Sequence, residues 1–100
     1  MGGGLAGIDR ITDFGGTDGL DFAGAAGSGT NYAEVGAAQT DFAAAQAAAQ
    51  GLMNGTVIYV AVTVGSDVVV FYDSDADNDA DEAVRLIGRA LTDIASGNII

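Results

Sequence analysis

The residues best able to do chemistry are six carboxylates within ten positions, from Asp73 to Glu82, a stretch we call the acidic segment. Its five aspartates fall at every second position: Asp73, Asp75, Asp77, Asp79 and Asp81. Like charges this close repel one another, and Ca²⁺ relieves such repulsion by taking about six to eight oxygen ligands from a loop. The first three aspartates match the opening ligand positions of the Asp-x-Asp-x-Asp calcium loop. Asp79 would then offer its backbone carbonyl, and Asp81 would bind directly or through water.

The acidic segment differs from a complete EF-hand loop at two positions. The sixth position is Asn78 instead of Gly, and the twelfth is Val84 instead of Glu. The flanks also have the composition of strands rather than helices. We therefore predict a calcium-bearing turn between two strands, with an affinity near ~10⁻⁴–10⁻³ M. The alternative is a solvated acidic hairpin tip that holds no ion.

Composition excludes several classes of function. The 100 residues predict one domain, 1–100. A net charge of −11, with only Arg10, Arg85 and Arg89 as cations, argues against nucleic acid or an anionic membrane as partner. No stretch has the length of a membrane span, and the N-terminal residues do not resemble a signal peptide.

The same composition argues against catalysis and against most metals. The chain has no Cys and no His, so thiolate and imidazole ligands are excluded. Its serines have no His or Lys to activate them, and its acids crowd one turn instead of facing each other across a cleft. We therefore expect a protein that is not an enzyme.

The glycine-rich residues 1–30 predict short strands around Ile11 and Leu20, joined by a Gly/Asp turn. The aspartates of this region are explained by turn chemistry and surface charge. The alternative is a second metal site formed by Asp9, Asp13, Asp18 and Asp21. Residues 23–30 predict a loop, and residues 31–35 a short extended piece.

Residues 40–53 predict the helix. Thr40 is a good N-cap, and Asp41 in the first turn suits the helix dipole. An apolar face runs along the helix, and Asn54-Gly55 would end it. The face is small, which favours packing on a sheet, and consists of Phe42, Ala45, Ala49, Leu52 and Met53.

Residues 56–88 predict a three-stranded meander. Gly65-Ser66 is a two-residue turn signal between the β-rich runs 56–64 and 67–72. Pairing about this turn puts Tyr59 opposite Tyr72 and makes both faces of the hairpin apolar, so the hairpin is sandwiched between layers or meets another subunit. Residues 83–88 predict the third antiparallel strand. The expected fold is mainly β with one α-helix (α+β), as an antiparallel sheet or sandwich with the acidic segment between strands.

Residues 89–100 predict a C-terminal tail. It ends in Ile99-Ile100, which is unusual for a frayed terminus. These isoleucines predict a final short strand or a signal that is read while the chain is unfolded.

Three pieces of this chain together resemble the C-terminal domain of repeats-in-toxin (RTX) calcium-binding exoproteins of Gram-negative bacteria, including the bluetail type. The first is Gly7–Phe14 followed by Gly16–Phe22. The second is Val68–Gly88, ending in Leu86-Ile87-Gly88, and the third is the C-terminus. The chain lacks tandem Gly-Gly-x-Gly-x-Asp blocks, so it has no β-roll.

The resemblance implies a secreted, extracellular or cell-surface protein. It implies export by a type I apparatus with an ABC transporter, and folding on external calcium. The C-terminus would carry the secretion signal, at Leu91, Asp93, Ile94, Asn98, Ile99 and Ile100. An alternative from a different class is a cell-surface subunit that self-assembles as a homo-oligomer into a filament or layer. The hairpin with two apolar faces and the terminal isoleucines favour that alternative.

Overall fold

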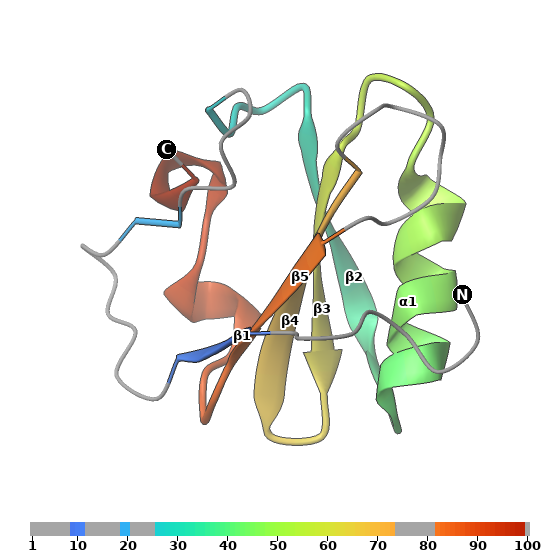
Figure 1. Cartoon of the computed structure of the whole chain (residues 1–100), viewed down its shortest axis with the longest axis vertical. Coiled ribbons are helices and arrows are strands. Elements are labelled where there is room, and N and C mark those ends of the chain that lie inside the picture. Colours follow the sequence, from blue (N-terminus) through green and yellow to red (C-terminus); the bar gives the residue numbers. More distant parts are fainter. Residues whose placement is uncertain (1–8, 12–18, 21–25, 74–81, 100) are drawn as a thin grey trace.

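The computed structural model describes residues 9–11, 19–20, 26–73 and 82–99. They form a small α+β domain with one helix, α1 (Phe42–Leu52), and a sheet of five strands: β1 (Asp9–Ile11), β2 (Tyr32–Gln39), β3 (Tyr59–Val64), β4 (Asp67–Tyr72) and β5 (Glu82–Leu86). The order in the sheet is β1-β5-β4-β3-β2 (Figure 1). Two single-turn 3₁₀ helices, Leu91–Asp93 and Ser96–Asn98, follow β5.

The central hairpin has the register that the sequence predicts. Tyr59 pairs with Tyr72, Val62 with Val69, and Val64 with Asp67. Gly65 reverses the chain with φ +59, a conformation that Gly adopts without strain. The third strand is also confirmed, because β5 pairs antiparallel with β4.

The sheet is mixed, which corrects the expectation of an antiparallel sheet or sandwich. β2 runs parallel to β3, and β1 runs parallel to β5. Parallel neighbours need a crossover connection, and α1 provides it between β2 and β3. The extended piece expected at 31–35 is in fact the start of the longer strand β2.

The outer strand β2 is irregular near its end. Val35 pairs with Val62 and Gln39 with Val64, so four residue steps of β2 lie against two of β3. The bulged residues Gly36, Ala37 and Ala38 are exposed and have low strand propensity. The strand continues past them because the Gln39 carbonyl accepts a hydrogen bond from the Gly65 amide at 3.2 Å.

The helix packs on one face of the sheet, as predicted. Ala45 and Ala49 are fully buried, and Phe42 lies against Phe71 of β4 with ring centroids 5.3 Å apart. The cap is Asp41 instead of Thr40, because the Asp41 carboxylate accepts the Ala44 amide at 2.8 Å. Leu52 is 40% exposed, so it is not part of the packed face.

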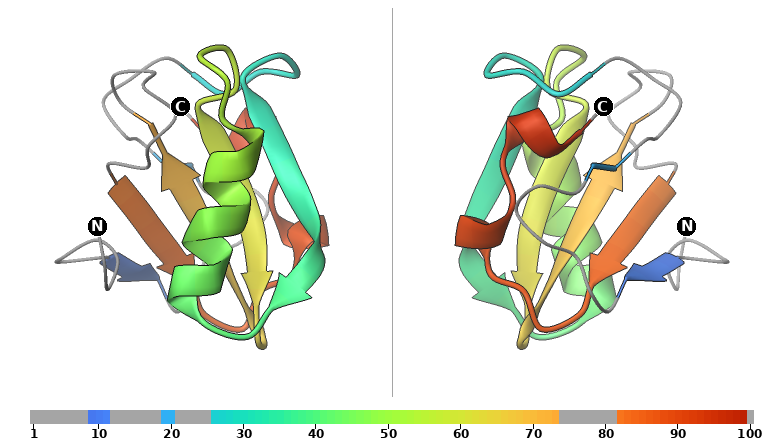
Figure 2. Two further views of the ribbon diagram at one scale, coloured as in Figure 1. Left: turned by 90° about the vertical axis from the view of Figure 1, so that its right-hand side faces the viewer. Right: turned by 90° about the vertical axis from the view of Figure 1, so that its left-hand side faces the viewer.

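Two apolar clusters cover the two faces of the sheet. The helix face consists of Val60, Val62, Val64, Val69, Phe71 and Ala83, and it packs on α1. The opposite face, which we call the tyrosine face, consists of Tyr59, Ala61, Val68, Val70, Tyr72 and Leu86. Leu20, Ile94 and Ile99 are buried against it, and the segment after β5 crosses this side of the sheet (Figure 2). The hairpin is thus sandwiched between layers of its own chain, one of the two expected arrangements.

Candidate metal site at the connection of β4 and β5

The acidic segment connects two neighbouring antiparallel strands. Tyr72, the last residue of β4, is the Cα partner of Glu82, the first residue of β5. Partners in an antiparallel pair lie about 4.5–5.5 Å apart at their Cα atoms. The connection therefore starts and ends at nearly the same place, and pairing brings the backbones of Asp73 and Glu82 close together.

Asp73 is the first residue of the acidic segment and directly follows β4. Only 1% of its surface is exposed, and its backbone amide donates a hydrogen bond to the Ile58 carbonyl at 2.8 Å. Glu82, by contrast, is exposed. A carboxylate buried as deeply as that of Asp73 is stable only where hydrogen-bond donors or a cation compensate for the lost water.

The other predicted ligands fall outside the described residues: Asp75, Asp77, Asp79 and Asp81. The same holds for most of the possible second site, Asp13, Asp18 and Asp21. Asp9 is in β1, where its Cα partner is Val84, two residues along β5 from Glu82. Among the residues that the structure describes, no group of three or more acidic side chains is placed to hold a metal ion.

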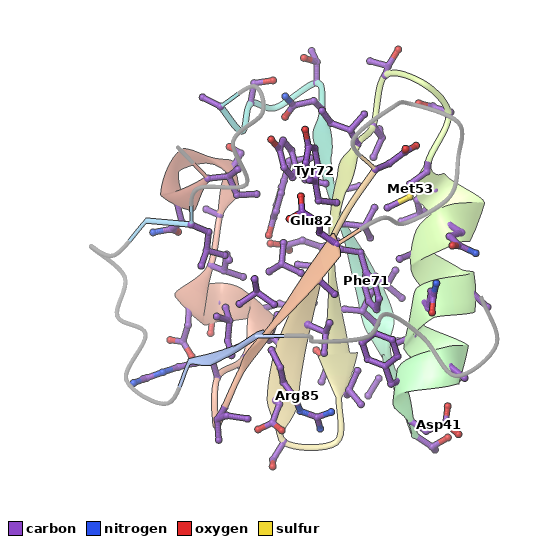
Figure 3. All side chains as sticks on the ribbon, in the orientation of Figure 1. Asp41, Met53, Phe71, Tyr72, Glu82 and Arg85 are labelled. Carbon is purple, nitrogen blue, oxygen red and sulfur yellow. The ribbon has the colours of Figure 1, made fainter. Side chains whose placement is uncertain are left out.

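The described arginines lie toward the other end of the sheet. The Arg85 Nε atom donates to an Asp67 carboxylate oxygen at 2.8 Å, at the start of β4 and thus at the end opposite Asp73. Figure 3 shows Arg85 well separated from Tyr72 and Glu82. Arg89 follows the far end of β5, and the backbone of Arg10 is in register with Arg85. The pairing thus places no arginine backbone at the end of the sheet where the acidic segment begins.

A row of tyrosines adjoins the candidate site. Tyr32, Tyr59 and Tyr72 are in register across β2, β3 and β4, and Glu82 of β5 completes the row. The rings of Tyr59 and Tyr72 stack with centroids 4.8 Å apart and planes 14° from parallel. The hairpin register predicts the central pair, but Tyr32 joins it only through the parallel pairing of β2, which has no local signal in the sequence.

The Tyr32 hydroxyl is held in its neutral form. It donates a hydrogen bond to a Glu34 carboxylate oxygen at 2.8 Å. Burial, this hydrogen bond and the negative charge of Glu34, in that order of importance, raise the pKa of Tyr32 above its usual value. This hydroxyl is therefore a hydrogen-bond donor at physiological pH.

The residues predicted as a C-terminal tail are packed into the domain. Ile94 and Ile99 are buried in the tyrosine-face cluster, and Leu91 packs against it. The Asp93 carboxylate accepts a hydrogen bond from the Ala90 amide at 2.9 Å. The Asn98 side-chain oxygen accepts one from the Ala95 amide at 2.8 Å. Ile99 forms a single parallel bridge with Leu20, which is less than the short final strand that the sequence offers as one alternative. Ile100 lies outside the described residues.

Comparison with known proteins identifies no relative, since no protein-family model, no curated protein and no solved structure matches this chain. Across the described part of the chain, no helix is long and apolar enough to cross a membrane.

Proposed function

We propose that this protein is a non-enzymatic, calcium-stabilised extracellular domain in which Ca²⁺ binds the acidic segment and completes the fold. The observation that carries the proposal is the pairing of Tyr72 with Glu82. It closes a connection with an aspartate at every second position, so the carboxylates belong to one loop that is fixed at both ends. Such a loop gathers oxygen ligands around a hard cation.

Electrostatics supports the same proposal. The acidic segment carries six of the 14 acidic residues of a chain with three arginines, and Arg85 is paired with Asp67 at the other end of β4. An external divalent cation is therefore the natural counter-charge. Because the proposed site depends on the antiparallel pairing of β4 and β5, the free energy of calcium binding would add to the free energy of folding.

The proposal includes export in an unfolded state, which the resemblance to calcium-binding exoproteins implies. The suggested signal residues Leu91, Ile94 and Ile99 pack against the core in the folded domain. A transporter that recognises them would have to do so before the domain folds. Weak folding at low calcium and completed folding at high external calcium would meet that requirement.

The experiment is thermal unfolding in 10 mM calcium and in chelator, at matched ionic strength. For a dissociation constant of ~0.1–1 mM, we expect calcium to stabilise the wild-type protein by about 1.4–2.7 kcal/mol. This corresponds to an increase in Tm of roughly 6–20 °C for a domain of this size. Equal melting temperatures in calcium and chelator would refute the proposal.

A pair of double variants with the same change of charge assigns the effect to the acidic segment. Asp75→Asn/Asp77→Asn should lose the calcium response, whereas Glu34→Gln/Asp41→Asn should keep it. Asn caps a helix as well as Asp, and Gln keeps an acceptor for Tyr32, so the control retains both hydrogen bonds. Terbium luminescence sensitised by the tyrosines gives a second readout, because Tyr72 directly precedes Asp73.

The structure offers less support for the alternative of a self-assembling subunit than for the proposed calcium-stabilised domain. The two apolar faces of the hairpin are covered by α1 and by the C-terminal segment, and Ile99 is 1% exposed. The outer strands also have features that oppose edge-to-edge pairing, since β1 has three residues and β2 is bulged. Light scattering tests the alternative: growth of large particles on adding calcium would favour assembly, and a compact monomer would favour the proposed domain.

A further inference from the structure

The segment after β5, residues 89–99, forms a strap across the tyrosine face. Gly88 reverses the chain with φ +70, and the strap then crosses the side of the sheet opposite α1 (Figure 2, right). Ile94 and Ile99 are its buried contacts, and Leu91 is half-buried. The strap is thus a continuous segment that buries part of the tyrosine face.

The strap is held differently from the strands beneath it. Its backbone bonds to other described elements lie at its far end, where the Leu20 amide donates to the Asn98 carbonyl at 2.6 Å and the Gly27 amide to the Ile99 carbonyl at 2.8 Å. β3 and β4, by contrast, are each paired on both sides along their length. Segments with few backbone tethers open at a lower free energy than central strands.

Asp67 fixes Gly88, the residue directly before the strap. One carboxylate oxygen of Asp67 accepts the Gly88 amide at 2.6 Å, and the other accepts Arg85 Nε at 2.8 Å. Asp67 is buried at the first position of β4, so both bonds are partly shielded from water. Charge-assisted hydrogen bonds of this kind are about twice as strong as neutral ones.

We propose that the strap opens and closes over the tyrosine face as a single unit, and that Asp67 is the latch that controls how often it opens. Opening exposes apolar surface on β3 and β4 while α1 and the helix face stay packed. The latch lies at the first residue of β4, whereas the acidic segment begins after the last residue of that strand, so the latch is separate from the proposed calcium site. It predicts that the two faces of the same strand become accessible at different rates.

Thiol labelling of the full chain tests the proposal, because the protein has no cysteine of its own. Ala61→Cys places a thiol under the strap, and Val62→Cys places a matched thiol under α1; both positions are fully buried on β3. We expect the thiol of Ala61→Cys to react faster. Adding Asp67→Asn should increase its rate about tenfold, the factor expected for losing one charge-assisted hydrogen bond, and should leave the Val62→Cys rate unchanged.

If Asp67→Asn changes both labelling rates by the same factor, the thiols are exposed by global unfolding and the strap is not a separate unit. If it changes neither rate, Asp67 is not the latch. Amide hydrogen exchange of wild-type protein is the check that needs no variant: amides at 93–99 should exchange in a common step before those of β3 and β4, and equal protection would overturn the inference.

Discussion

The ring of Tyr72 stacks on the ring of Tyr59, and the residue after Tyr72 is the buried Asp73. The central hairpin is therefore joined directly to the start of the acidic segment. Asp73 in turn donates its amide to Ile58, the neighbour of Tyr59, so both members of the stacked pair are fixed at the same end of the sheet. The stacked tyrosines and the start of the acidic segment thus lie at the same end of the sheet.

The stacked pair should contribute a measurable coupling energy. In a double-mutant cycle with Tyr59→Leu and Tyr72→Leu, we expect a coupling of about 0.5–1.5 kcal/mol in the free energy of unfolding, beyond the loss of buried area. Urea unfolding of the four proteins measures it. Tyr59→Leu combined with the distant Asp41→Asn should be additive, and additivity of the tyrosine pair as well would contradict the stacking argument.

Tyr32 should make stability depend on alkaline pH. The raised pKa means that folding favours the neutral hydroxyl, so its contribution is fully present below about pH 10, the ordinary tyrosine value, and is lost as pH rises above it. The urea midpoint of the wild type should therefore fall more steeply above pH 10 than that of Tyr32→Phe. Equal slopes in the two proteins would show that the hydroxyl is not protected by the fold.

Gly27 should not tolerate a side chain. A Cβ atom there would overlap the Ser96 carbonyl oxygen and lie 2.9 Å from the Ile99 Cβ atom. We expect Gly27→Ala to destabilise the protein by about 1–3 kcal/mol, as overpacking does. The control is Gly29→Ala, where a Cβ atom meets nothing within 4 Å. Thermal melts compare the two, and similar Tm values would mean that the strap does not approach Gly27 this closely.

The Asp41 cap should account for part of the stability of α1. Asp41→Ala removes the acceptor for the Ala44 amide and should cost about 1 kcal/mol, whereas Asp41→Asn should cost a few tenths of a kcal/mol at most. Chemical unfolding followed by circular dichroism gives both values. A similar loss in the two variants would assign the effect to charge instead of capping.

The sequence by itself determined the local elements. The turn at Gly65 with flanking β-branched residues specified the hairpin register, and the alanine-rich run after Asp41 specified the helix, because both depend on neighbours within a few residues. The position of the acidic segment between antiparallel neighbours follows from the β-rich runs on either side of it, 67–72 and 83–88. The residues of the acidic segment that would bind calcium are predicted from the sequence alone.

Only the tertiary structure decided the rest. The parallel pairing of β2 with β3 and of β1 with β5 joins segments that are not connected by a tight turn. Residues 36–38 of β2 are Gly and Ala, whose low strand propensity gives no sign that the strand continues through them. The C-terminal residues have the composition of a tail, yet Ile94 and Ile99 pack on the tyrosine face because the sheet has two apolar faces and α1 covers only one. Burial of the second face is a property of the assembled layers, and no local pattern specifies which segment will supply it.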